Sequence, residues 1–67
     1  MSPPNQPSKP SALPLQPGDW VRHPDRPDWG VGQIQSIIGQ RITANFEHAG
    51  KLVINAALVS LLRAEEP

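Results

Sequence analysis

Residues 30–46 read GVGQIQSIIGQRITANF and carry the strongest structural signal in the chain. Residues 41–46 alternate apolar and polar side chains, which is typical of a strand that lays one face on a core. Residues 30–38 form a second apolar segment, and Gly39 followed by Gln40 predicts a two-residue type II′ turn between the two segments. We therefore expect an antiparallel hairpin, whose opening glycines permit a sharp bend or a close backbone approach.

A further strand is predicted on each side of this hairpin. Residues 18–23 alternate so that Val21 faces the core, and the two prolines that follow prevent this strand from continuing. Residues 47–50 read EHAG and predict a turn, after which residues 51–55 form the next strand. The central part of the chain is thus predicted as four consecutive strands joined by short connections.

The segment that follows, residues 58–63, is open to two interpretations. As a fifth strand it would follow a single helical turn capped by Asn55. As part of a helix it would extend over residues 56–63, since alanine and leucine favour helices. We predict the strand, because closing a small sheet into a barrel removes both of its exposed edges.

The predicted fold is therefore all-β, a small five-stranded SH3-like barrel in meander order over residues 16–63. Residues 1–15 are predicted to be a disordered proline-rich tail, because six of the nine prolines lie in the first 17 positions. Residues 64–67 form a short acidic end. The predicted core consists of the apolar residues Val21, Val31, Ile34, Ile38, Ile42, Ala44, Phe46, Leu52, Ile54, Leu58 and Leu61.

Composition narrows the possible functions. The chain has 67 residues and no cysteine, and its six basic and six acidic side chains cancel. Zero net charge gives little of the long-range field that drives non-specific nucleic-acid binding. No apolar run reaches the length of a signal peptide or a membrane span. We expect a monomeric cytoplasmic protein that does not contact a membrane and has no cofactor.

The residues that could support catalysis lie in the proline-rich loop after the first strand. The loop contains residue types that could act as acids and bases, namely His23, Asp25 and Asp28. General acid–base catalysis, however, needs a pocket that holds a substrate. A barrel of this size fills its interior with side chains and leaves no such pocket. The spacing of His23 and His48 matches no zinc or calcium pattern. We therefore predict a protein that is not an enzyme and binds no metal.

A binding surface is the remaining interpretation, and its predicted residues are Trp20, Arg22, Arg26, Asp28 and Trp29. Exposed tryptophan beside arginine is typical of hot spots in protein–protein interfaces and of surfaces on which nucleic-acid bases stack. The alternative for each indole is that it caps an open end of the barrel. We expect a protein partner, and direct nucleic-acid binding through arginine and tryptophan is the second hypothesis.

Two families share the motifs of this region. Residues 18–24, GDWVRHP, followed by residues 29–34, WGVGQI, resemble the small Tudor/SH3-like domain at the C-terminus of UvrD/PcrA-type DNA helicases. Residues 27–32, PDWGVG, together with residues 45–51, NFEHAGK, resemble a family of short, free-standing bacterial proteins whose domain has no known function.

The first resemblance implies a binding module, because the helicase domain is similar to Tudor-like domains that contact RNA polymerase. RNA polymerase or a repair factor is therefore an implied partner. The second resemblance implies a fold and no activity. Together they cover residues 18–62 and exclude the proline-rich tail.

Overall fold

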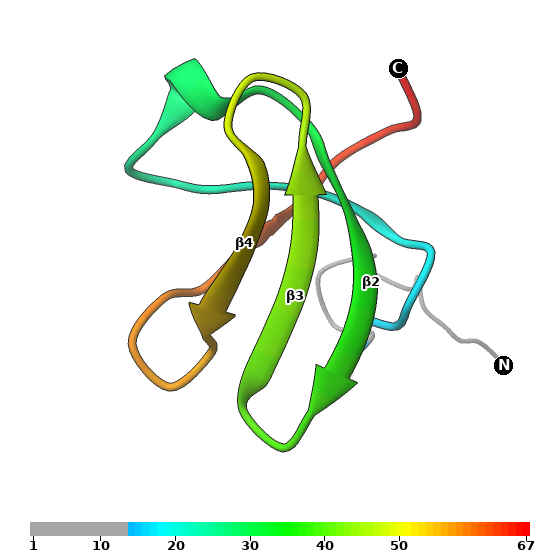
Figure 1. Ribbon diagram of the computed structural model, residues 1–67, viewed down its shortest axis with the longest axis vertical. Coiled ribbons are helices and arrows are strands. Elements are labelled where there is room, and N and C mark those ends of the chain that lie inside the picture. Colours follow the sequence, from blue (N-terminus) through cyan, green and yellow to red (C-terminus); the bar gives the residue numbers. More distant parts are fainter. Residues whose placement is uncertain (1–13) are drawn as a thin grey trace, which may run out of the picture.

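The computed structural model describes residues 14–67, which form one five-stranded antiparallel sheet (Figure 1). The strand order is β4-β3-β2-β1-β5, so each strand pairs with its neighbour in sequence except that β5 lies beside β1. One short 3₁₀ turn, η2, interrupts the connection between β1 and β2. The elements are β1 (Trp20–Arg22), η2 (Pro27–Trp29), β2 (Gly32–Ile38), β3 (Arg41–Phe46), β4 (Gly50–Asn55) and β5 (Leu62–Arg63).

The predicted all-β class and the five strands are confirmed, but the predicted closure is not observed. β4 and β5 stand at the two ends of the sheet and do not pair with each other. The reason is that β5 contains only two residues and pairs with β1 alone. The sheet therefore keeps two edges that a closed barrel would have removed.

The hairpin of β2 and β3 forms where the sequence predicts it. Ile38 and Arg41 are paired, which leaves Gly39 and Gln40 as the two-residue turn. Gly39 has φ of 58°, and within the described residues only glycines have positive φ. This combination fits the predicted type II′ turn, which needs positive φ at its first central residue only.

A β-bulge in β2 changes which isoleucine reaches the core. Ile34 pairs with Ala44 and Ser36 pairs with Thr43, so Gln35 is an extra residue on the β2 side. After the bulge Ile37 lies opposite Ile42 and packs against the core. Ile38 is 71% exposed, so its predicted place in the core is wrong. The strict period of two that predicted it was broken by the single inserted residue.

The core forms along the inner faces of β1 to β4. Of the predicted core residues, Leu52 and Leu61 are half-buried and pack against it. Gly32 makes room for this packing, because a Cβ at that position would lie 2.6 Å from Cδ1 of Phe46. The buried apolar residues are Val21, Val31, Ile34, Ile42, Ala44, Phe46 and Ile54.

The segment after β4 is neither a long strand nor a helix. Oδ1 of Asn55 accepts a hydrogen bond from Ala57 N at 2.9 Å, and its carbonyl accepts from Leu58 N at 3.0 Å, which forms the predicted capped turn. Extended pairing begins only at Leu62, and Leu58 is 81% exposed. Its predicted core position is wrong because the turn carries it past the edge of the sheet.

The two ends of the described chain meet beside β1. Leu15, the last residue of the predicted tail, packs against the core. Asp19 Oδ2 accepts hydrogen bonds from Arg63 Nη1 at 3.0 Å and from Gln16 N at 2.9 Å. The rest of the predicted tail, residues 1–13, lies outside the described residues.

Candidate binding surface

The loop that joins β1 to β2 is hydrogen-bonded within itself. Pro27 begins η2, and Arg26 accepts at its carbonyl from Trp29 N at 3.1 Å. Before η2, Arg26 N donates to the carbonyl of His23 at 3.2 Å, and Asp25 N donates to Nδ1 of His23 at 3.1 Å. The two prolines restrict the backbone further, since each fixes its own φ. These hydrogen bonds and the two prolines therefore hold the loop backbone in one conformation.

The same loop is tied to the turn between β3 and β4. His48 N donates to the carbonyl of Trp29 at 3.0 Å, and Glu47 N donates to the carbonyl of Val31 at 2.9 Å. Gly30 has φ of 77°, and a Cβ there would lie 2.8 Å from Cδ2 of His48. Glycine is required at this crossing both for its conformation and for the close approach.

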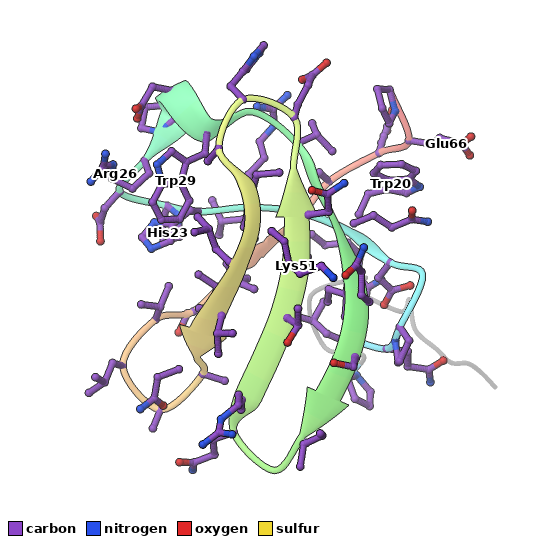
Figure 2. All side chains as sticks on the ribbon, in the orientation of Figure 1. Trp20, His23, Arg26, Trp29, Lys51 and Glu66 are labelled. Atoms are coloured by element: carbon purple, nitrogen blue, oxygen red, sulfur yellow. The ribbon has the colours of Figure 1, made fainter. Side chains whose placement is uncertain are left out.

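Trp29 lies at the centre of the cluster on this loop, which we call the loop cluster and define as His23, Arg26, Asp28 and Trp29. The half-buried indole contacts the ring of Phe46 with centroids 5.2 Å apart, and it meets the ring of His23 edge-on at 4.8 Å. Cζ of Arg26 lies 5.0 Å from the centroid of the same indole. Figure 2 shows the labelled side chains of His23, Arg26 and Trp29 together at one side of the sheet.

Of the two alternatives that the sequence left open for Trp29, the geometry shows the indole covering one end of the core. The indole does so through its contact with the ring of Phe46. The guanidinium of Arg26 over the ring is a cation–π contact, which at an exposed site is typically worth about 0.5–1 kcal/mol. Trp29 therefore supports the loop from the core while its cluster remains at the surface.

The charges of the loop cluster are balanced and accessible. Nε of Arg26 lies 3.6 Å from Oδ1 of Asp28, and the two side chains are 52% and 69% exposed. An exposed pair of this kind contributes little to stability, typically about 0.2–1 kcal/mol. It offers instead one donor group and one acceptor group, held side by side, to whatever contacts the loop.

The structure does not bring the five predicted site residues together. Arg26, Asp28 and Trp29 belong to the loop cluster, whereas Trp20 lies beside the C-terminal segment on the opposite side of the molecule in Figure 2. The carbonyl of Trp20 accepts from Ala64 N at 2.7 Å, which fixes it there. Arg22 is exposed and lies opposite Leu62 of β5.

Two members of the arrangement were missed as binding or supporting residues. His23 was considered for catalysis and for metal binding but not as part of a binding surface. Phe46 was predicted as core, but nothing in the sequence indicates that it also carries the indole. That contact joins residues 17 positions apart and depends on the path of the loop.

Residues 14–67 contain no group of three or more histidine, aspartate or glutamate side chains placed to hold a metal ion. Among these residues there is also no helix long and apolar enough to cross a membrane. A shallow hollow of about 400 Å³ lies at the other end of the β2–β3 hairpin and is lined by Ile38, Gln40, Arg41, Val53, Ile54 and Asn55.

The open sheet and the loop cluster define a small all-β module. The family described as "Protein of unknown function (DUF3553)" matches residues 15–64, and the chain belongs to this family. The expected membership of a family without known function is thereby confirmed. The comparison with curated proteins and the comparison with solved structures gave no match to the chain.

Proposed function

We propose that the protein is a non-catalytic binding module of the SH3-like, Tudor-like type, which docks a protein partner through Arg26, Asp28 and the exposed part of Trp29. The observation that carries the proposal is the construction of the loop cluster. Arg26, which forms an exposed ion pair with Asp28, lies over the ring of Trp29, and that ring packs against Phe46 of the core. Tryptophan and arginine in such a setting are the residues that dominate binding energy at protein interfaces.

The order of the loop supports a binding role on energetic grounds. Ordering a rotamer-rich side chain at an interface costs about 0.5–1.5 kcal/mol, and ordering a loop adds to this cost. Here the backbone hydrogen bonds of residues 23–30 and the contacts of Trp29 are present before any partner binds. Much of the conformational entropy of the loop is therefore lost on folding and does not reduce the affinity for a partner.

The resemblance to the C-terminal domain of UvrD/PcrA-type helicases supports the fold type and suggests the partner. The positions shared with the helicase domain have mainly structural roles in this chain. Asp19 accepts a hydrogen bond from Arg63, Gly30 lies against the β3–β4 turn, and Gly32 leaves room for the ring of Phe46. RNA polymerase or a repair factor is the partner that this resemblance suggests, and we include it in the proposal as the first protein to test.

Direct nucleic-acid binding is the second hypothesis, and the distribution of charge supports it less. Arg41 and Lys51 extend from β3 and β4 and not from the loop, and Arg26 already has Asp28 at 3.6 Å. A phosphate would therefore compete with a neighbouring carboxylate. The net charge of the chain is zero, which removes the general attraction to a polyanion.

The test is an affinity capture from a native bacterial lysate, followed by direct binding to purified core RNA polymerase. The bait variant is Arg26→Ala with Asp28→Ala, which removes the exposed charges and leaves Trp29 on the core. The matched control is Arg41→Ala with Glu66→Ala, which removes one exposed charge of each sign away from the loop. Trp29→Ala is not used, because it would also uncover Phe46.

We expect the control to retain the captured proteins and the loop variant to recover them at least about tenfold less, since truncating an interface hot spot costs about 2 kcal/mol or more and about 1.4 kcal/mol is already a factor of ten. Equal recovery by both baits would contradict the proposed surface. Affinity that falls by orders of magnitude as salt rises, with nucleic acid in the captured material, would favour the second hypothesis.

A further inference from the structure

The edge strand β4 lies outside the loop cluster, so an interaction through it is independent of the proposed function. β4 stands at the end of the sheet, and its only strand partner among the described residues is β3. Natural edge strands are commonly protected by proline, by a bulge or by several charges. β4 reads GKLVIN, with no proline, with an unbroken register against β3 and with Lys51 as its single charge.

The pairing with β3 determines which backbone groups of β4 face outward. Ala56 N donates to the carbonyl of Gln40 at 2.7 Å, so these two residues form a hydrogen-bonded pair. Such pairs alternate along an antiparallel ladder, which assigns Leu52 and Ile54 to the β3 side. The N–H and C=O groups of Lys51 and Val53 therefore point away from the sheet, toward the open edge.

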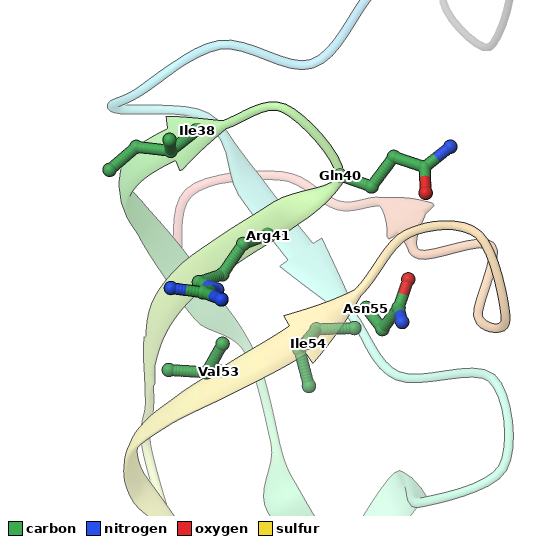
Figure 3. Close-up of a pocket in the computed structure, with 6 residues that line it drawn as sticks. All are labelled: Ile38, Gln40, Arg41, Val53, Ile54 and Asn55. Carbon is green, nitrogen blue, oxygen red and sulfur yellow. The ribbon is translucent and has the colours of Figure 1, made fainter.

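Apolar surface continues next to this edge. Val53 is 60% exposed, and Ile38 is 71% exposed on the same face of the sheet. Figure 3 shows the side chain of Arg41 between these two, with all three directed to the same side. The shallow hollow of about 400 Å³ described above is formed by these residues and their neighbours. An added strand would cover the apolar part of this surface.

We infer that the edge of β4 pairs with β4 of a second copy, antiparallel about a twofold axis at Val53. In this register Val53 lies opposite its own counterpart, and Lys51 lies opposite the second copy's Asn55. Leu52 likewise lies opposite the second copy's Ile54 on the inner face. No like charges are opposed, and the outward-facing residues of one copy meet those of the other, as an isologous contact requires. At Asn55 the pairing uses the N–H group, because the carbonyl already accepts from Leu58 N and Val59 N within its own turn.

The choice of a second copy also follows from what the chain itself can supply. Residues 1–13 are a poor source of an added strand, because they contain Pro3, Pro4, Pro7 and Pro10 and proline has no N–H to donate. Zero net charge means that two copies do not repel each other at long range. A contact between six-residue strands is small beside the roughly 1,200–2,000 Å² of a stable interface. The dimer is therefore weak and forms as concentration rises.

The experiment is sedimentation of the full chain over a roughly fifty-fold range of concentration that reaches about 1 mM, with amide NMR spectra of the same samples. The first variant is Val53→Lys, which opposes two like charges at the axis. The second is Val53→Pro, which removes the outward N–H without removing a hydrogen bond to β3. The control is Thr43→Lys, which adds the same charge on the paired residue one strand inside the edge.

We expect the average mass of the wild type and of Thr43→Lys to rise toward twice that of the monomer, while Val53→Lys remains a monomer. The amides of Lys51 and Val53 should shift with concentration in the wild type. The dispersion of the NMR spectrum reports whether each variant is folded, and a folded Val53→Pro should also remain a monomer. A wild type that stays monomeric throughout overturns the inference. Equal loss of dimer in Thr43→Lys also overturns it, because the contact would then use the face of the sheet and not its edge.

Discussion

Two parts of the sheet hold together in different ways. In the part formed by β2, β3 and β4, the β3–β4 ladder has six paired positions, and these strands supply Ile34, Ile42, Ala44, Phe46 and Ile54 to the core. In the part formed by β1 and β5, the strands have three and two residues, and β1 has only two paired positions with each neighbour.

The smaller part depends on a few contacts between residues that are far apart in sequence. Asp19 bonds to Arg63, 44 positions away, and the carbonyl of Trp20 accepts from Ala64 N. Arg63 Nη2 also donates to the carbonyl of Pro14 at 3.4 Å. One part is thus stabilised by long strand ladders and five buried apolar side chains, whereas the other contributes only Val21 to the core and otherwise depends on single polar contacts. Variants that act on one part or the other can test this difference.

The largest effect is expected from Phe46→Ala in the β2–β4 part. Phe46 is 2% exposed, fits against Gly32 and supports Trp29. Removing a buried phenylalanine side chain lowers the free energy of unfolding by about 3–5 kcal/mol, which is comparable with the whole stability of a domain this small. We expect an NMR spectrum that has lost its chemical-shift dispersion, and no cooperative urea transition. Phe46→Leu, which keeps most of the volume, should retain a transition. A cooperative transition of Phe46→Ala near that of the wild type would contradict the central role of this part.

An intermediate effect is expected at the contact that joins the two ends. The side chains of Asp19 and Arg63 are 28% and 24% exposed, and hydrogen bonds to charged groups are worth about 1.5–3 kcal/mol. We expect Asp19→Ala to lower the free energy of unfolding by about that amount, because Gln16 N loses its partner as well. A double-mutant cycle with Arg63→Ala, measured by urea unfolding, isolates the pair.

A second double-mutant cycle on the exposed pair of Arg26 and Asp28 provides the coupling energy for comparison. Its coupling energy should be smaller, about 0.2–1 kcal/mol, because both side chains are more than half exposed. If the two cycles give the same coupling energy, the contact between Asp19 and Arg63 does not hold the β1–β5 part in place.

The smallest effect of a single substitution is expected at Ile38, in contrast to its neighbour Ile37, which lies after the same bulge but packs against the core. Ile37 is half-buried and packs against the core, so Ile37→Ala should cost about 1–2 kcal/mol, less than for a fully buried isoleucine. Ile38 is 71% exposed, so Ile38→Ala should change stability by no more than about 0.5 kcal/mol. Thermal unfolding of both variants tests the order, and a larger loss for Ile38→Ala would place the bulge elsewhere.

The sequence predicts the β2–β4 part well for a physical reason. Residues 41–46 have a period of two with one apolar face, and Gly39 permits the turn that brings their partner strand alongside. These are local signals, and each is readable within a few residues. The prediction failed at Ile38, because a bulge is one unpaired residue in an otherwise regular pattern and leaves no mark in composition.

The candidate site was predicted only in part, because a surface is a long-range property. Arg26, Asp28 and Trp29 are neighbours in sequence and stay together in the loop cluster. Trp20 is only nine positions before Trp29, yet pairing with the C-terminal segment carries it to another side of the molecule. The role of Phe46 beneath the indole likewise required the loop to cross the β3–β4 turn.

By itself, the sequence determined the all-β class, the hairpin, the turn residues and most of the core, since periodicity and glycine act over short distances. The tertiary structure alone decided three things: which end of the core Trp29 covers, how Asp19 and Arg63 meet, and that the edge of β4 is left open. Each depends on where distant segments come to lie, and the short β5 shows why. A two-residue strand can be placed only by the strand it pairs with, and its brevity leaves the sheet unclosed.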